Sequence, residues 1–254
     1  MLTKQLIEAF PKETRFINEE DNFLRVSEFY YDTIQGEGIS IGCPAAFLRL
    51  QGCSLSCIWC DTTEVWGKGN PYTFTELIDM IVGSGLAGKL MDGQHLVITG
   101  GSPLRQQIRL CRFLQALAEV TGIVPFVEVE NECVIFPVRP LINQVTLWNN
   151  SPKLSNSGVP TALRYKPELI QLMSLLDGSW FKFVIEKTSD WDEIESEFLN
   201  PSLIRREQII LMPCGSTRME LEEKREMVVG LAVKEGVRYC SREHIVLWNK
   251  RTGV

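Results

Sequence analysis

AAFLRLQGCSLSCIWCD, residues 45–61, decides the fold and the chemistry of this chain, because an apolar, strand-like run passes directly into three closely spaced cysteines. Cys53, Cys57 and Cys60 follow the spacing CxxxCxxC, with no obvious fourth cysteine beside them. A structural zinc site takes four protein ligands, whereas a 4Fe-4S cluster held by three thiolates keeps one iron open to a small molecule. The spacing therefore favours a catalytic cluster. A zinc knuckle completed by a distant cysteine and three unrelated buried thiols are the alternatives.

A second motif, LVITGGSPL at residues 96–104, is an apolar strand that runs into two glycines and a proline. Glycine has no Cβ, so Gly100 and Gly101 let the backbone approach a ligand closely, and Pro103 ends the strand. Taken alone, the pattern also fits an ordinary turn between a strand and a helix. Its position after the cysteines favours a loop that binds a cofactor.

The composition fits one α/β domain that acts on a small molecule. The chain has 254 residues, of which 44% are hydrophobic and 23% charged, enough for a substantial core. Its formal charge of −6 argues against a broad basic face that grips nucleic acid. No segment has the uninterrupted apolar length of a signal peptide or a membrane span, and the cysteines outside the motif are scattered. We therefore expect a cytoplasmic protein with reduced thiols.

Strand-like and helix-like segments alternate along the chain. Apolar runs predict strands at residues 45–50, 95–98, 125–129, 144–148, 180–185, 208–212 and 244–248. Amphipathic patterns predict helices at residues 73–81, 106–120, 167–176, 190–199 and 219–234, the first with a capping box of Thr73 and Glu76. Such repeated βα units predict a doubly wound sheet or a barrel, with the functional loops at the carboxyl ends of the strands.

Together these features resemble the radical S-adenosylmethionine enzymes. In that superfamily three cysteines hold a 4Fe-4S cluster, an aromatic residue like Trp59 precedes the third cysteine, and a Gly-Gly-Glu-Pro loop contacts the methionine amino group. Ser102 stands where that loop has glutamate, which removes a charge from the contact. The resemblance implies a partial (β/α)6 TIM-like barrel in a single domain, residues 26–254, behind an N-terminal extension, residues 1–25.

Further motifs narrow the resemblance to the 7-carboxy-7-deazaguanine synthase family, from about Phe29 to the end of the chain. They are Ile-Gln-Gly-Glu-Gly at 34–38, Phe-x-Arg-x-x-Gly-Cys at 47–53, Cys-Asp-Thr at 60–62, Ser-Pro-Lys at 151–153 and Arg-x-His at 242–244. The family converts 6-carboxy-5,6,7,8-tetrahydropterin to 7-carboxy-7-deazaguanine, with loss of ammonia, on the route to queuosine. The implied chemistry is a radical removal of the hydrogen at C6 of the pterin, so we expect no acid-base side chain.

The resemblance also implies the role of each site residue. The cluster ligands are Cys53, Cys57 and Cys60; the S-adenosylmethionine contacts are Trp59, Gly100, Gly101, Ser102, Ser151, Pro152, Lys153, Met212 and Pro213; the substrate contacts are Ile34, Gln35, Gly36, Glu37, Arg49, Thr99, His244 and Val254. Thr62 is the expected ligand of a Mg²⁺ ion, which prefers oxygen donors. The guanidinium of Arg49 suits bidentate binding of the substrate carboxylate. We expect the Cys214 thiol, a hydrogen-atom donor, to face away from the radical.

Partners follow from the same resemblance: a pterin substrate, an electron donor such as flavodoxin or ferredoxin and a second copy in a homodimer, with neither nucleic acid nor membrane. Two other functions stay open. A radical activase shares the cysteines and S-adenosylmethionine but acts on a protein backbone, and a non-catalytic relative of the same fold binds a cluster or zinc. Ser102 gives the second alternative some support.

Overall fold

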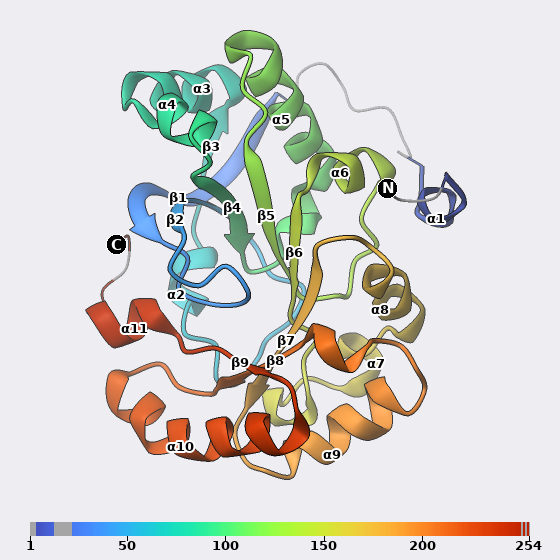
Figure 1. The fold of residues 1–254 in the computed structure, drawn as a ribbon. Coiled ribbons are helices and arrows are strands. Elements are labelled where there is room, and N and C mark those ends of the chain that lie inside the picture. The colour runs from blue at the N-terminus through green and yellow to red at the C-terminus, as the bar shows by residue number, and fades with distance from the viewer. Residues whose placement is uncertain (1–3, 13–21, 250, 252, 254) are drawn as a thin grey trace.

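One curved sheet organises the computed structural model, which describes residues 4–12, 22–249, 251 and 253 (Figure 1). Its strands are β1 (Phe23–Ile34), β2 (Pro44–Leu50), β3 (Asn70–Thr73), β4 (His95–Gly100), β5 (Phe126–Asn131), β6 (Leu147–Asn150), β7 (Ser179–Ile185), β8 (Ile209–Pro213) and β9 (Arg238–Tyr239). They are ordered β3-β1-β2-β4-β5-β6-β7-β8-β9. From β2 to β9 all neighbours are parallel, while β1 pairs antiparallel with β2 and β3.

The strand order is that of an open barrel. From β2 to β8 the chain adds each new parallel strand beside the previous one, so it always advances in the same direction around the sheet. A doubly wound sheet reverses its direction at a switch point, and this sheet does not. The predicted α/β class and partial (β/α)6 barrel are confirmed.

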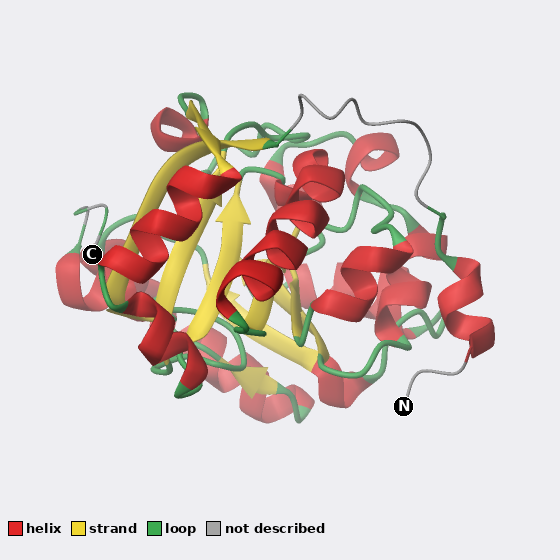
Figure 2. Ribbon diagram, turned by 90° about the horizontal axis from the view of Figure 1, so that it is seen from above, coloured by secondary structure: helices red, strands yellow, loops and turns green. Residues whose placement is uncertain are grey.

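Most helices pack along the outer side of this sheet, as Figure 2 shows from above, whereas α2 (Thr63–Trp66) and α11 (Glu243–Trp248) lie beside the cavity on its inner side. The other helices are α1 (Lys4–Ala9), α3 (Phe74–Gly83), α4 (Leu86–Met91), α5 (Gln107–Thr121), α6 (Arg139–Gln144), α7 (Thr161–Arg164), α8 (Pro167–Ser174), α9 (Asp190–Ile194) and α10 (Arg218–Glu235). The predicted capping box of Thr73 and Glu76 opens α3. A second box, Thr217 with Glu220, opens α10. Both boxes satisfy amide groups that the first helical turn leaves unpaired.

The pleat of the strands separates an apolar outer layer from a polar inner one. In β7, Phe181 and Phe183 belong to the main core under the helices, whereas Lys182 and Val184 line a cavity on the other side. In β2 the same alternation buries Leu48 in the core and turns Arg49 to the cavity. Since side chains alternate with a period of two, one strand serves both layers.

Two sequence predictions of secondary structure need correction. Residues 244–248 form helix α11 and not a strand, although their apolar run is strand-like. The short β9 takes the edge position beside β8 instead, and α11 packs against α10 with only Ile245 buried. The strand predicted at 144–148 begins only at Leu147, because helix α6 continues to Gln144.

Parts of the predicted N-terminal extension pack against the domain. Phe10 is 1% exposed within the main core, and its carbonyl accepts a 2.7 Å hydrogen bond from Nε of Arg139. Strand β1 begins at Phe23, inside the extension predicted as residues 1–25. Among the helices of the described residues, none has the length and hydrophobicity needed to cross a bilayer.

The capping box of α10 yields a stability prediction. Thr217→Ala removes the oxygen that accepts the Glu220 amide, so we expect a loss of about 1 kcal/mol in the free energy of unfolding. Thr217→Ser keeps the hydroxyl and should unfold close to the wild type. Urea titrations followed by circular dichroism compare the three proteins. Equal losses in both variants would assign the effect to the methyl group.

Candidate functional site

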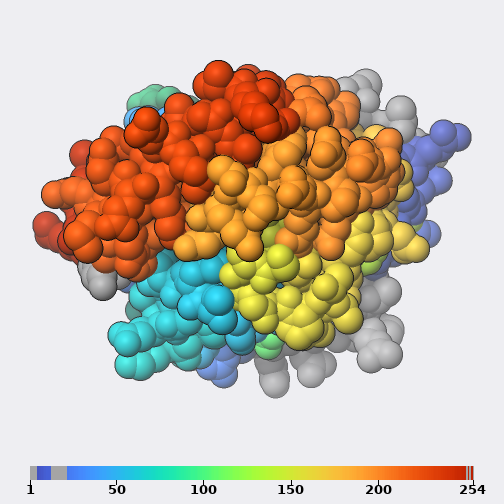
Figure 3. All heavy atoms as spheres, turned by 90° about the horizontal axis from the view of Figure 1, so that it is seen from below, coloured from blue at the N-terminus to red at the C-terminus, as the bar shows by residue number. Residues whose placement is uncertain are grey.

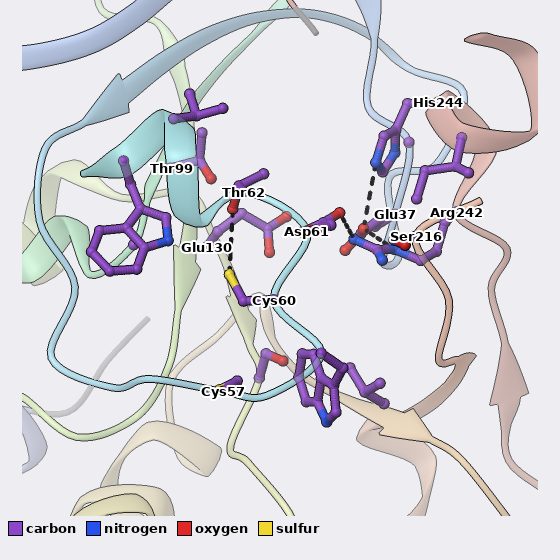
Figure 4. Close-up of a pocket in the computed structure, with 18 of the residues that line it drawn as sticks. Glu37, Cys57, Cys60, Asp61, Thr62, Thr99, Glu130, Ser216, Arg242 and His244 are labelled. Atoms are coloured by element: carbon purple, nitrogen blue, oxygen red, sulfur yellow. Dashed lines mark hydrogen bonds and ion pairs between the residues drawn. The ribbon is translucent and has the colours of Figure 1, made fainter. Parts of the chain in front are cut away.

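A cavity of ≈ 800 Å³ lies inside the curved sheet, where the carboxyl ends of its strands meet. The cavity is lined by Arg49 of β2, Thr99 of β4, Glu130 of β5 and Met212 of β8. Figure 4 shows the cysteine loop on one side of this space, with Glu37, Arg242 and His244 grouped on another. The end of a parallel barrel is where this fold class concentrates its binding loops.

The cysteine loop leaves β2 and crosses the cavity with all three thiols on its wall. Cys53, Cys57 and Cys60 are free thiols of intermediate exposure. The Leu55 amide donates to Sγ of Cys53 at 3.3 Å. The amide of Ile58 donates to the carbonyl of Ser157 at 2.9 Å, which joins the loop to the segment after β6. In the space-filling view these two segments, cyan and yellow, meet at the surface (Figure 3).

The paired glycines at the end of β4 allow this loop to lie directly against the sheet. Gly100 has φ +141°, and a Cβ there would stand 2.2 Å from the carbonyl oxygen of Leu50. A Cβ on Gly101 would stand 2.4 Å from Cβ of Cys53. Contacts this short exclude any side chain. The sequence predicts that these glycines allow a ligand to approach the backbone, and the structure adds a second role, because they also let the cysteine loop lie against the sheet.

The three free thiols line one cavity, as the ligands of a single cluster must. Burial raises the pKa of Cys57, and the neighbouring Lys153 ammonium acts in the opposite direction, favouring the thiolate that binds iron. Across the described residues, no three His, Cys, Asp or Glu side chains converge to hold a single metal ion. A 4Fe-4S cluster needs no such convergence, because each thiolate binds a different iron.

Trp59 and the segment after β6 form the wall beside the thiols. The indole Nε1 donates to Oδ1 of Asn156 at 3.2 Å, and Nζ of Lys153 lies 5.6 Å from the ring centre of Trp59. The same Nζ donates to Oγ of Ser151 at 2.8 Å, and the Ser151 amide donates to the Asn131 carbonyl. These contacts hold the aromatic ring of Trp59 and the ammonium of Lys153 next to the thiols of the cysteine loop.

Buried ion pairs form the opposite wall. Nζ of Lys182, on β7, lies 2.5 Å from a carboxylate oxygen of Glu37 and 3.0 Å from one of Glu130. Arg242 binds Glu37 at 2.8 Å and Asp61 at 2.5 Å (Figure 4). Against the effect of burial, Lys182 and Arg242 hold the pKa of Glu37 well below its usual range. Burial raises the pKa of Glu130, with Lys182 acting against it. These pairs join the β1–β2 loop, β5, β7, the cysteine loop and the residue that precedes α11.

Deeper in the barrel, amides and carboxylates bind one another. Nε2 of Gln35 donates to Glu128 at 2.6 Å and to Glu130 at 3.1 Å. Glu128 also accepts from Oγ of Ser40 at 2.7 Å and contacts Nδ1 of His95 at 2.9 Å. The side-chain amide of Gln35 is therefore occupied, and its segment offers mainly backbone groups to a ligand.

Arg49 lies on the wall of the cavity, next to Glu28 and Tyr30. Its Nε donates to Glu28 at 2.9 Å, and only 14% of its side chain is exposed. Burial opposes the charged form, but Tyr30 and Glu28 raise the pKa of Arg49. Because a guanidinium has five N–H groups, it can hold Glu28 and still receive a second anion.

Comparisons with known proteins identify the family. A profile described as "4Fe-4S single cluster domain" matches residues 34–126. A 7-carboxy-7-deazaguanine synthase of Pyrobaculum aerophilum is 35% identical over 91% of this chain and 97% of its own. The chain belongs to the 7-carboxy-7-deazaguanine synthase family. The Halobacterium salinarum synthase is 33% identical over 89% of this chain and 91% of its own. The crystal structure of QueE from Escherichia coli has the same fold, with a TM-score of 0.64 and 20% identity over 87% of this chain and 95% of that one.

The cavity brings together most of the residues that resemblance to this family assigned to the site. On the wall are Ile34, Gln35, Gly36, Glu37, Arg49, Cys53, Cys57, Trp59, Cys60, Thr62, Thr99, Gly100, Gly101, Ser151, Lys153, Met212 and His244. Ser102, Pro152 and Pro213 are buried and do not line the cavity. Val254 lies outside the described residues. His244 sits on helix α11, with Nε2 3.9 Å from Glu37.

Several wall residues were missed or left unassigned by the sequence analysis. Lys182, Glu130 and Glu132 line the cavity, and each is at least partly buried. For Lys182 a signal was present, since a lysine inside the apolar strand Ser179–Ile185 demands a buried partner. Which partner it has depends on the fold, because Glu37 and Glu130 come from distant parts of the chain.

The two residues after the third cysteine, Asp61 and Thr62, both have partners in the folded chain. Oγ1 of Thr62 lies 3.7 Å from Sγ of Cys60, and Asp61 is paired with Arg242 (Figure 4). Cys214 belongs to the cavity wall, and burial raises the pKa of its thiol to about 12, assisted by the adjacent Glu186 carboxylate. That its sulfur faces away from a radical stays a prediction.

The close contact of Gly101 with Cys53 predicts the outcome of a glycine substitution. Gly101→Ala forces the cysteine loop off the sheet, so we expect most of the iron to be lost after anaerobic reconstitution. Gly230→Ala, on α10 with no atom within 4 Å of the new Cβ, is the control and should load normally. Iron and sulfide analysis measures both. Full loading of the Gly101 variant would contradict the proposed packing role.

Proposed function

We propose that this chain catalyses the radical ring contraction of 6-carboxy-5,6,7,8-tetrahydropterin to 7-carboxy-7-deazaguanine, with loss of ammonia. The observation that carries the proposal is the cavity itself, which is lined by three free thiols of one loop, by Arg49 and by buried ion pairs. Membership of the 7-carboxy-7-deazaguanine synthase family supports the same reaction. Queuosine biosynthesis is the pathway to which that product belongs.

Cys53, Cys57 and Cys60 would hold a 4Fe-4S cluster, and S-adenosylmethionine would bind beside it. When bound, this pair of cofactors supplies a one-electron reductive cleavage that makes a carbon radical able to remove a hydrogen atom. The chain's part is to position the cofactor: Trp59 offers an aromatic face for its adenine, while Ser151 and Lys153 offer polar groups at the same wall. Gly100 and Met212 complete the wall without charge.

At the other end of the cavity Arg49 would bind the substrate carboxylate. Lys182 and Arg242 are already neutralised by acidic partners, so they position other groups more than they attract an anion. Thr62 has a hydroxyl on the wall and would contribute one oxygen to a Mg²⁺ ion, with the substrate and water supplying the others. Ile34, Gly36, Thr99 and His244 would contact the pterin.

A radical reaction demands a site without stray hydrogen donors. Ile245 of α11 and, beyond that helix, Asn249 and Arg251 line one side of the cavity. Side chains in these positions limit the access of water and of other donors while the radical exists. A contact of Val254 with the substrate rests on the family resemblance alone, since this residue lies outside the described residues.

The remaining partners rest on the family resemblance. An electron donor such as flavodoxin or ferredoxin would reduce the cluster, and two copies of the chain would form a homodimer. A location in the cytoplasm is supported by the cysteines, all eight of which are free in the structure.

The cluster can be tested apart from the reaction. Cys57→Ser removes one thiolate, and we expect reconstituted protein to lose the broad absorbance at about 400 nm that marks a 4Fe-4S cluster. Cys43→Ser is the matched control, because Cys43 does not line the cavity. It should keep both the absorbance and the iron. A colourless wild type that binds zinc would instead support the non-catalytic alternative.

The substrate is tested at Arg49. Arg49→Lys keeps the charge but loses the planar pair of donors, so we expect kcat/KM for carboxytetrahydropterin to fall about 10- to 100-fold, largely through KM. Arg205→Lys, on an exposed ion pair, should change nothing. The assay contains reductant, Mg²⁺ and S-adenosylmethionine, and it measures deazaguanine and deoxyadenosine separately. Deoxyadenosine without deazaguanine in the wild type would point to another substrate, such as the protein backbone of an activase.

A further inference from the structure

Glu132, the first residue after β5, is a buried carboxyl group without a hydrogen-bond partner. It is 5% exposed and lies on the cavity wall. Among the residues that the structure describes, no donor reaches either of its carboxylate oxygens with hydrogen-bond geometry. A buried acceptor left in this state costs free energy, which a donor bound from the cavity would recover.

The position of Glu132 is set by the neighbouring strands. β5 lies beside β4 in the sheet, with Ile98 opposite Val129, so the residues that follow the two strands are neighbours as well. Cys133 has φ 60°, and the chain turns sharply there. Burial raises the pKa of the Glu132 carboxyl, while the Ser102 hydroxyl acts most strongly in the opposite direction, from a position near hydrogen-bonding reach that falls short of full hydrogen-bond geometry. The two side chains are therefore adjacent.

Ser102 is not available to the cavity. It is 1% exposed and does not line the wall. Its Oγ accepts a hydrogen bond from the Ser54 amide at 2.7 Å and lies 3.7 Å from Sγ of Cys53. These contacts hold the cysteine loop, and they leave the binding of a cofactor to another residue.

The geometry of the side chains connects the two residues. The Oγ of a serine occupies the place that Cγ would take in a glutamate at the same position. A carboxylate next to that hydroxyl therefore lies near the point that a glutamate at position 102 would reach. Because serine is small, it leaves room there for the side chain of Glu132. Two carboxylates in that space would repel each other, so only one of the two would be ionised and able to accept a charge-assisted hydrogen bond.

We propose that Glu132 binds the amino group of S-adenosylmethionine, taking the part of the glutamate that Ser102 replaces; this inference rests on the proposed function. The amino group is an N–H donor, and the two open oxygens of Glu132 are acceptors at the cavity wall. The bond is charge-assisted, which the serine hydroxyl cannot offer. Glu132, which follows β5, thus supplies the carboxyl group that the Gly-Gly-Ser-Pro loop after β4 lacks.

A competing explanation is that Glu132 only balances the charge of Lys153. That ammonium and Arg105 both favour the ionised carboxyl. However, Nζ of Lys153 donates to Oγ of Ser151, and Arg105 donates to the carbonyl of Cys53 at 3.3 Å. Neither cation forms a hydrogen bond with Glu132 in the described part of the chain.

The test uses full-length protein with its reconstituted cluster and measures the Kd of S-adenosylmethionine by anaerobic calorimetry. Glu132→Gln should weaken binding about 10- to 100-fold, the range expected when a charged hydrogen-bond partner is lost. Ser102→Glu alone should also weaken it, because two carboxylates then compete for one space. The exchange Ser102→Glu with Glu132→Ser should recover affinity to within a few-fold of the wild type. Glu64→Gln, an equal change of charge on the same wall, is the control.

A second readout is the electron paramagnetic resonance spectrum of the reduced cluster, with and without S-adenosylmethionine. Wild type and the exchange variant should respond to the cofactor at the same concentration, and Glu132→Gln only at a higher one. Circular dichroism and iron content show whether each variant is folded and loaded.

The outcomes separate this inference from the proposed function. A loaded wild type that binds no S-adenosylmethionine would overturn both. If the wild type binds it and Glu132→Gln binds equally well, the role of Glu132 is wrong and the proposed function stands. If Glu132→Gln weakens binding but the folded, loaded exchange variant does not recover it, Glu132 acts only through Lys153 and the inference also fails.

Discussion

The buried ammonium of Lys182 is the interaction on which the arrangement of the site depends. It projects from β7 into the barrel, where an uncompensated charge would cost several kcal/mol, and it is ion-paired with Glu37 and Glu130. Glu37 in turn holds Arg242, which holds Asp61 in the cysteine loop. Removing one member would leave a buried charge without its partner. Elements far apart in the sequence are therefore fixed at one cavity by the requirement that this lysine be neutralised.

The alternation of side chains along parallel strands makes such an interior possible. Phe181 and Phe183 stabilise the layer between sheet and helices, and Lys182 between them is free to serve the cavity. A shift of one residue in register would reverse both faces, placing the charge in the core and the rings in the site. Stability and function thus share the same strands without competing for the same positions. The apolar face fixes the register, and the register positions the polar residues.

The local patterns in the sequence were sufficient for the βα order, the cysteine loop and the glycine pair, because each depends on neighbouring residues. They failed at residues 244–248, where an apolar run of strand-like composition forms α11 since β9 already occupies the edge of the sheet. The partners of Lys182 and Arg49 were also out of reach, because Glu130 and Glu28 approach them only in the folded chain. The composition of a strand shows that a buried charge needs a partner, whereas only the fold shows which one.

The proposed role of Glu132, which supplies a carboxylate that position 102 lacks, shows why a linear motif is an incomplete description of such a site. The loop after β4 must approach the cysteine loop so closely that Gly101 has no room for a side chain, and the Ser102 hydroxyl supports that contact by accepting the Ser54 amide. A glutamate at position 102 could reach the cofactor, but it has no hydroxyl at the point where Ser102 accepts the Ser54 amide. Moving the carboxylate to the end of β5 lets both needs be met, because neighbouring parallel strands end at the same rim of the barrel. The amino group of S-adenosylmethionine requires a carboxylate acceptor at one position, and a residue that follows either β4 or β5 can supply it.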